Sequence, residues 1–213
     1  MKRLFFLLTL CFAACNVHDT IAFDDIDASL RTTYTISGRV IWEHDDLTGV
    51  DSTTVTLSGA ENQSTLTDSN GDYSFTVSTL GNYTITPSKT INLMNGVTVA
   101  DATAIQQHVA GLISINDPYK RVAADVSSEG QLSTLDASII KQAVLGNPAA
   151  LSKMNPSWKF VDSSYALVLP PLPYQVPTGY PQSISISLAG DAFGINFVGI
   201  KRGDVNGSAD PIH

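Results

Sequence analysis

Alternation of apolar and polar residues is the clearest pattern in the first half of the chain. From Tyr34 onward, Val, Ile, Thr and aromatic residues recur at every second position, in short runs bounded by Gly, Asn, Asp or Ser. Successive side chains of a strand point to opposite faces of a sheet, so this pattern predicts β-strands. We expect five of them, at 34–42, 53–58, 64–67, 72–77 and 81–86.

Near residue 90 the pattern changes to a period of about 3.6, which is typical of helices. Two segments, 97–111 and 132–146, align position by position: an apolar residue, Asp four positions later, then Ile and Val at the same interval, and finally Gly. The two glycines, Gly111 and Gly146, stand where a helix normally ends. The repeat therefore predicts two similar amphipathic helices.

A loop with the spacing of an EF-hand precedes the second helix, in residues 125–136. Gly130 stands at the sixth position, where the loop must turn sharply. Calcium takes about six to eight oxygen ligands, and this spacing directs alternate side chains toward one point. The segment predicts a calcium site, or else a relic loop that keeps the fold without the ion. The predicted ligands are Asp125, Ser127, Glu129, the carbonyl of Gln131, and Asp136.

The first repeat lacks half of such a loop. No acidic residue comes shortly before Gly96, and Asp101 follows Gly96 by one position fewer than Asp136 follows Gly130. The C-terminal segment 203–208, however, reads Gly-Asp-Val-Asn-Gly-Ser, like the missing half. Our hypothesis is that this segment returns to the first repeat and completes a split calcium site; the alternative is a loose acidic tail. The ligands of the split site would be Asp101, Asp204, Asn206 and Ser208.

The strand-rich block, 34–89, resembles the prealbumin-like sandwiches of the Cna-type B and carboxypeptidase-regulatory-like families. The likeness is carried by Ile36-Ser-Gly-Arg-Val, by Thr67-Asp-Ser-Asn-Gly-Asp-Tyr-Ser-Phe and by Gly81-Asn-Tyr-Thr-Ile. It implies a β-sandwich, a fold that serves as a spacer or as a glycan-binding module. Trp42 and Tyr83 are candidates for a sugar-stacking platform, although aromatic residues in strands more often belong to the core.

The block 90–147 resembles a dockerin, whose repeats pair a calcium loop with the helix that follows it. Flanking segments such as Asn95-Gly-Val-Thr and Tyr119-Lys-Arg-Val-Ala-Ala-Asp125 are similar to dockerin-containing surface proteins of the Bacteroidetes type. The resemblance implies calcium as the cofactor and, as partner, a cohesin-like protein of a polysaccharide-degrading assembly or the chain's own C-terminal extension. The implied partner-binding residues are Thr134, Leu135, Lys141 and Gln142.

The first fifteen residues read as a lipoprotein signal peptide. Lys2 and Arg3 precede an apolar run, and Ala13-Ala14-Cys15 resembles a lipobox in which Cys15 becomes lipid-modified. The alternative is an ordinary cleaved signal with Cys15 incidental. We expect the polar segment 16–33 to be a tether, and a lipid anchor to hold the protein at the outer membrane or cell surface.

The segment 148–213 holds most of the prolines together with short apolar pieces that contain Trp, Phe and Ile. A free linker would not be so rich in these residues. We expect an irregular extension, with one or two strands, that packs back on the helical pair. The predicted fold class is thus multidomain β plus α: a small sandwich, a dockerin-like helical pair and a Pro-rich extension.

Charge and missing motifs narrow the function. A formal net charge of −8 argues against nucleic acid as a partner, and no cysteine follows Cys15 that could form a disulfide or a zinc site. No hydrolase or phosphate-binding motif is present, and we read Glu43, Asp45 and Asp46 as a solvated loop rather than as glycosidase carboxylates. An enzyme is not expected. The leading interpretation is a calcium-dependent assembly module; the alternatives are a glycan-binding protein that uses the sandwich and a purely structural spacer.

Overall fold

The computed structural model describes residues 32–212 and contains eight strands and four helices within them. The five strands expected in the first half are present within a residue or two of their predicted ends. In chain order, the elements are β1 (Tyr34–Trp42), β2 (Thr54–Gly59), β3 (Gln63–Leu66), β4 (Asp72–Val77), β5 (Gly81–Ser88), α1 (Val99–Val109), α2 (Pro118–Ala124), α3 (Thr134–Val144), α4 (Pro148–Lys153), β6 (Trp158–Asp162), β7 (Ile184–Leu188) and β8 (Phe197–Lys201).

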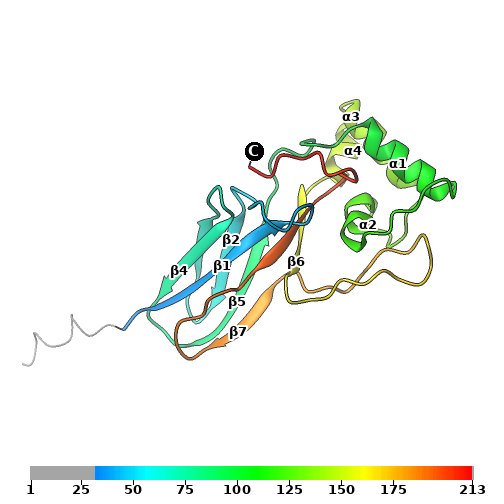
Figure 1. Ribbon diagram of the computed structural model, residues 1–213. Coiled ribbons are helices and arrows are strands. Elements are labelled where there is room, and N and C mark those ends of the chain that lie inside the picture. Colours follow the sequence, from blue (N-terminus) through cyan, green and yellow to red (C-terminus); the bar gives the residue numbers. More distant parts are fainter. Residues whose placement is uncertain (1–31, 213) are drawn as a thin grey trace, which may run out of the picture. The chain divides into compact units, whose positions relative to one another are not determined.

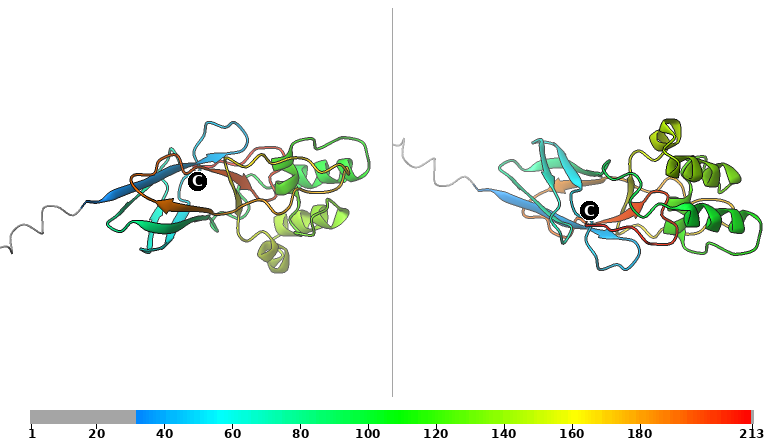
Figure 2. Two further views of the ribbon diagram at one scale, coloured as in Figure 1. Left: turned by 90° about the horizontal axis from the view of Figure 1, so that it is seen from below. Right: turned by 90° about the horizontal axis from the view of Figure 1, so that it is seen from above.

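The strands form two four-stranded sheets in a sandwich-like arrangement, with the helices gathered at one end (Figures 1 and 2). One sheet has the order β4-β1-β8-β6 and the other β3-β2-β5-β7. β1 and β8 are parallel, and all the other paired strands are antiparallel. The chain is therefore a mixed α/β protein with two sheets and few helices.

The C-terminal segment has a larger part in the sheets than the sequence predicts. Instead of only packing on the helices, residues 148–213 supply β6, β7 and β8, and so complete both sheets that the first five strands begin. The physical reason lies in the large side chains of Trp158, Phe160 and Phe197, which fill the core between the sheets. The sandwich thus extends well beyond the predicted block 34–89.

β8 lies between two hydrophobic cores. All five of its residues are buried, so both of its faces are covered. Phe197 belongs to the core between the sheets, whereas Ile200 belongs to the core under the helices. A strand covered on both faces is typical of the interior of a domain rather than of its edge. Because β6 divides its residues in the same way, with Phe160 in one core and Val161 in the other, the two strands join the sandwich to the helical part.

The helices α1 and α3 begin with the same device. Thr98 and Ser133 are their N-caps, and each forms a capping box with the acidic residue three positions later. At the other ends, Gly111 and Gly146 have positive φ angles, which a glycine adopts without steric cost. The two shorter helices, α2 and α4, are not predicted by periodicity, because each spans only about two turns.

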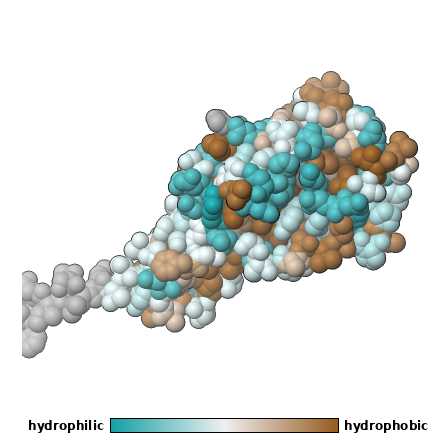
Figure 3. Space-filling view, viewed as in Figure 1, coloured by the Kyte–Doolittle hydropathy of each residue, from teal (hydrophilic) through white to brown (hydrophobic). Residues whose placement is uncertain are grey.

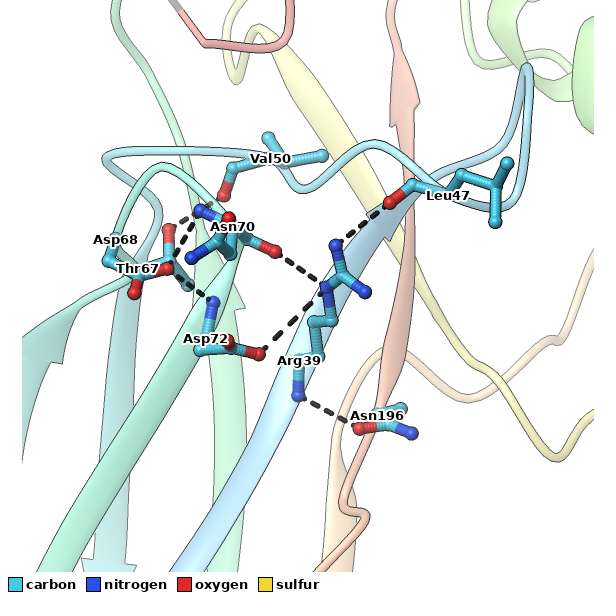
Figure 4. Close-up of polar contacts among 8 residues, drawn as sticks. All are labelled: Arg39, Leu47, Val50, Thr67, Asp68, Asn70, Asp72 and Asn196. Carbon is cyan, nitrogen blue, oxygen red and sulfur yellow. Dashed lines mark hydrogen bonds and ion pairs between the residues drawn. The ribbon is translucent and has the colours of Figure 1, made fainter.

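The turn between β3 and β4 is fixed by Asp68 (Figure 4). Its Oδ1 accepts hydrogen bonds from the N–H groups of Asn70 (2.8 Å) and Asp72 (2.9 Å). Arg39 on β1 donates from Nε to the carbonyl oxygen of Asn70 and forms an ion pair with Asp72 at 3.8 Å. The motif at 67–75 that carries the sandwich resemblance therefore has a structural task, which is to fix this turn against β1.

The lipidation candidate Cys15, the leader and nearly all of the tether lie outside the described residues. From residue 32 to residue 212, no helix has the length and apolar character that crossing a bilayer requires.

Replacing Phe197 by Ala should lower the free energy of unfolding by about 3–5 kcal/mol, because the side chain is fully buried where β8 enters the sandwich. Phe193→Ala is the matched control; that ring is 67% exposed, and the change should cost about 0.5 kcal/mol or less. Urea denaturation of both variants measures the difference. Equal midpoints would contradict the placement of β8 between the two cores.

Candidate metal centre

The loop 125–136 is curled around Asp125, which directly follows α2. One carboxylate oxygen, Oδ1, accepts hydrogen bonds from the N–H of Glu129 (3.1 Å) and the hydroxyl of Ser127 (3.2 Å). The other, Oδ2, accepts from the N–H of Gly130 (3.0 Å). Ser128 and Gly130 have positive φ angles, which lets successive N–H groups turn toward one carboxylate.

Asp136, in the first turn of α3, closes the same loop. Its Oδ1 accepts from the N–H of Ser127 (2.9 Å), and its Oδ2 accepts from the N–H of Ser133 (2.9 Å). Asp125 is 4% exposed and Asp136 is fully buried. The structure thus brings Asp125, Ser127 and Asp136 together, as the spacing predicts.

Glu129 is placed differently from the other predicted ligands. Its side chain is exposed, and within the loop only its N–H is engaged, with Asp125. Gln131 lies where the C-terminal extension pairs with the loop: Leu132 donates its N–H to the carbonyl of Tyr174, and Val176 donates to that of Gly130. The extension therefore holds the middle of the loop in place.

The C-terminal segment lies beside the first repeat. The N–H groups of Val205 (2.8 Å) and Asn206 (3.1 Å) donate to Oδ1 of Asp101, and the hydroxyl of Ser208 donates to the carbonyl of Gly96 (2.9 Å). Asp101 is fully buried in the first turn of α1, and its Oδ2 accepts from the N–H of Thr98 (2.8 Å). Residues far apart in the sequence thus form one hydrogen-bonded loop.

This split loop repeats the pattern of the continuous one. Asp204 accepts from the N–H groups of Gly207, Ser208 and Ala209, much as Asp125 accepts from those of its own loop. Asn206 donates to the closing aspartate as Ser127 does in the other loop. Gly207, with φ 73°, takes the left-handed conformation that Ser128 takes, with φ 63°.

The correspondence changes the role predicted for Gly96. Because Thr98 and Ser133 are equivalent N-caps, Gly96 matches Gln131 and not the turn glycine. The turn position belongs to Ala209. Gly96 is required for space as well as for its φ of 70°, since a Cβ there would lie 2.4 Å from Cα of Ala209. The sequence signal for this register is the pair of capping boxes: aligning Thr98 with Ser133 matches Gly96 to Gln131, whereas aligning Gly96 with Gly130 does not.

Four buried aspartates are therefore gathered in two loops, and none of them has an ionic partner within 4 Å; Arg39 with Asp72 is the one ion pair found in residues 32–212. Burial raises the pKa of Asp204 above its ordinary value of 3.8, and the neighbouring charge of Asp101 raises it further. The nearby cations Lys159, Lys201 and Arg202 donate to main-chain carbonyls, and their charges act on the aspartates from a longer distance than an ion pair. The aspartates are Asp101, Asp125, Asp136 and Asp204.

Glu43, just after β1, is an acidic residue whose importance the sequence does not reveal. Asp45 and Asp46 are exposed, as a solvated loop predicts, but Glu43 is 7% exposed. Both of its carboxylate oxygens are buried without a hydrogen-bond partner. Burial raises its pKa well above 4.5, and the nearby charge of Asp204 acts in the same direction. Glu43 is thus an acid near the split loop whose ionised form is disfavoured by burial and by Asp204.

The donor set of both loops suits a hard cation. Each loop gathers two carboxylates together with hydroxyl and main-chain oxygens, which are ligands that calcium accepts. No three His, Cys, Asp or Glu side chains are grouped for metal binding within the part of the chain that the structure describes. An ion here would depend on the neutral oxygens as well as on the acids.

The positions predicted to contact a partner lie at the helical surface. Thr134, Leu135 and Gln142 are exposed, and Lys141 is half-buried, with its Nζ donating to Gln106 at 2.8 Å. Trp42 and Tyr83, by contrast, are buried in the sandwich core. They present no face on which a sugar could stack.

Comparison with protein-family models, with curated proteins and with solved structures found no match to this chain.

Replacing Glu43 by Gln should stabilise the protein at neutral pH and not at pH 4. Because the folded-state pKa of Glu43 is raised, the unfolded chain ionises first, and the wild type loses stability as pH rises above about 4.5. The glutamine does not titrate, so its advantage should grow over that range. Urea denaturation in chelator at several pH values measures it.

Glu61→Gln is the control of opposite sign, because hydrogen bonds from Ser78 and Thr79 lower the pKa of Glu61. A pH-independent difference between Glu43→Gln and the wild type would contradict the unpartnered, buried carboxyl group.

Proposed function

We propose that this protein is a non-catalytic, calcium-binding surface lipoprotein whose dockerin-like helical pair serves protein–protein assembly. One observation carries the proposal: two loops of matching hydrogen-bond pattern each bury two aspartates that form no ion pair within 4 Å in the described residues. A buried carboxylate without a counter-charge is costly. A divalent cation in each loop would supply that charge.

In the continuous loop, the ion would be held by Asp125, Ser127, Asp136 and the carbonyl of Gln131. Glu129 would have to turn inward from its exposed position, or leave its place to water. The ion would compensate the charge of the two aspartates and so stabilise the turn that leads into α3. Metal binding of this kind contributes directly to folding free energy.

In the split loop, the ion would be held by Asp101 and the carbonyl of Gly96 on one side and by Asp204, Asn206 and Ser208 on the other. Two segments would supply its ligands: the one that leads from β5 into α1, and the C-terminal segment after β8. Binding would therefore fasten the C-terminal segment to α1. That segment follows β8, so the ion would also stabilise the junction between the helices and the sandwich.

Assembly is supported by the apolar residues at the helical end of the molecule, visible as brown patches in Figure 3. Leu135, on the first turn of α3, is 45% exposed, and Leu145, just after α3, is 85% exposed. Exposed apolar residues that gather on one part of a surface favour protein contact. From the dockerin resemblance we propose a cohesin-like partner linked to polysaccharide degradation. From the lipobox-like segment that ends at Cys15 we propose attachment to the outer membrane or cell surface.

The two alternative functions, a glycan-binding sandwich and a purely structural spacer, have less support than the assembly module. A glycan-binding sandwich loses its stacking residues, because Trp42 and Tyr83 are 6% and 1% exposed. A purely structural spacer would need neither the loops nor the exposed helical residues. We therefore retain the assembly module as the main proposal.

Calorimetric titration of the full chain with calcium should show about two sites, one for each loop. Asp125→Asn and Asp204→Asn should each remove one site, because the amide keeps the shape but not the charge of the carboxylate. Asp191→Asn, an exposed residue of the sandwich, is the control and should retain both. A wild-type count of one would reject the split site, and a count of zero would reject the proposal.

A purified cohesin domain should bind the protein in calcium and not in chelator. Leu135→Asp should weaken that binding by about tenfold or more, because a charge would be buried in the contact. Leu66→Asp, on β3 and also exposed, should have no effect. If calcium binds but no cohesin does, the docking part of the proposal is wrong and the ion-binding part stands.

A further inference from the structure

The continuous loop is in contact with two cationic side chains that come from the sheets. Arg202, just after β8, donates from Nη2 to the carbonyl of Val126 (2.9 Å) and to the hydroxyl of Ser128 (2.6 Å), which both belong to the loop. Lys159 on β6 donates from Nζ to the carbonyl of Asp125 at 3.2 Å. The fold therefore brings two positive charges to this loop from outside the helical repeat.

These two cations and the two aspartates of the continuous loop act on one another. Burial lowers the pKa of Lys159 to about 8 and also lowers the pKa of Arg202. The charges of Asp125 and Asp136 act on both cations in the opposite direction. Two negative charges thus lie close to two positive charges, and in a protein interior such charges interact over more than the length of an ion pair.

The split loop lacks an equivalent pair of cations. In residues 32–212, no lysine or arginine side chain donates a hydrogen bond to the segments 96–101 and 204–209. The charge of Lys201 acts on Asp101 and Asp204, but its Nζ donates to the carbonyl of Leu93. The next ionisable group near Asp204 is an acid, Glu43, and not a second cation. The two aspartates of the split loop therefore share one cation.

This difference in charge has a consequence for ion binding. A cation in the continuous loop would meet two positive charges as well as two negative ones, and like charges repel strongly where water does not screen them. A cation in the split loop would meet an excess of negative charge. Loop closure alone favours the opposite order, because the ligands of the continuous loop are close together in the sequence.

We propose that Lys159 and Arg202 are built-in counter-charges that weaken calcium binding in the continuous loop, so that the split loop is the tighter of the two sites. This inference rests on the function proposed above, because it takes both loops to bind calcium. It gives the loops different tasks. The split loop binds calcium first and fastens the C-terminal segment to α1, and the continuous loop fills at a higher calcium concentration.

Calorimetric titration of the full chain with calcium at pH 7 tests the order of binding. The wild type should show two sites whose Kd values differ by about fivefold or more. Asp204→Asn should remove the tight site, and Asp125→Asn should remove the weak one. If both sites bind equally tightly, or if Asp125→Asn removes the tight site, this inference is wrong and calcium binding stands. An absence of calcium binding would reject the proposed function and this inference with it.

Lys159→Met tests the role of the charge directly, because it keeps most of the half-buried stem and removes the ammonium group. Calcium should bind the weak site about fivefold or more tightly in this variant, since one repulsive charge is gone, and the tight site should not change. The rise in Tm on adding calcium should also be larger than in the wild type.

Lys153→Met, which alters an exposed lysine on α4, is the matched control and should change neither affinity. Unchanged or weaker binding at the weak site of folded Lys159→Met would overturn the counter-charge role. If Lys159→Met does not fold, the order of the two sites in Asp125→Asn and Asp204→Asn still decides the matter.

Discussion

The burial of four aspartates in two loops is the constraint on which the arrangement of the helical part depends. Each carboxylate is surrounded by main-chain N–H groups, which orients it but does not cancel its charge. In the continuous loop the chain satisfies this constraint locally. In the split loop it must bring Asp204 back to Asp101, so the C-terminal segment has to pass β8 before the first repeat is complete.

The same return path explains why the sandwich and the helices form one compact unit, residues 33–213. β8 is parallel to β1 and covered on both faces, and Lys201 at its end is fully buried, donating to the carbonyl of Leu93 (2.8 Å) just before the first repeat. Burial lowers the pKa of Lys201 to about 8, and the charge of Asp204 acts in the opposite direction. A substitution or an ion at the split loop is therefore expected to alter the stability of β8, the strand that links the two cores.

The strands and helices with strong periodicity are readable from the sequence, because local patterning determines them. The five strands before residue 90 and the helices α1 and α3 are of this kind. The pairing of β1 with β8 is not readable, since parallel pairing depends on contacts between residues far apart. The loop motif also predicts which residues meet around Asp125 and Asp136, and the Gly-Asp-Val-Asn-Gly-Ser segment suggests the partner of Asp101. It does not predict that Glu129 lies outward, that Ala209 occupies the turn position, or that Glu43 is buried near Asp204, because burial and tertiary contact decide these features.

The most direct measurement is thermal unfolding of the full chain in millimolar calcium and in chelator, followed by circular dichroism. If cations compensate the buried aspartates, a calcium concentration of about one hundred times the Kd adds about 2.7 kcal/mol per site to the free energy of unfolding. Each occupied site should then raise the Tm by about 5–10 °C. Helix content should also be higher in calcium. The same Tm and the same helix content in both conditions would contradict the account.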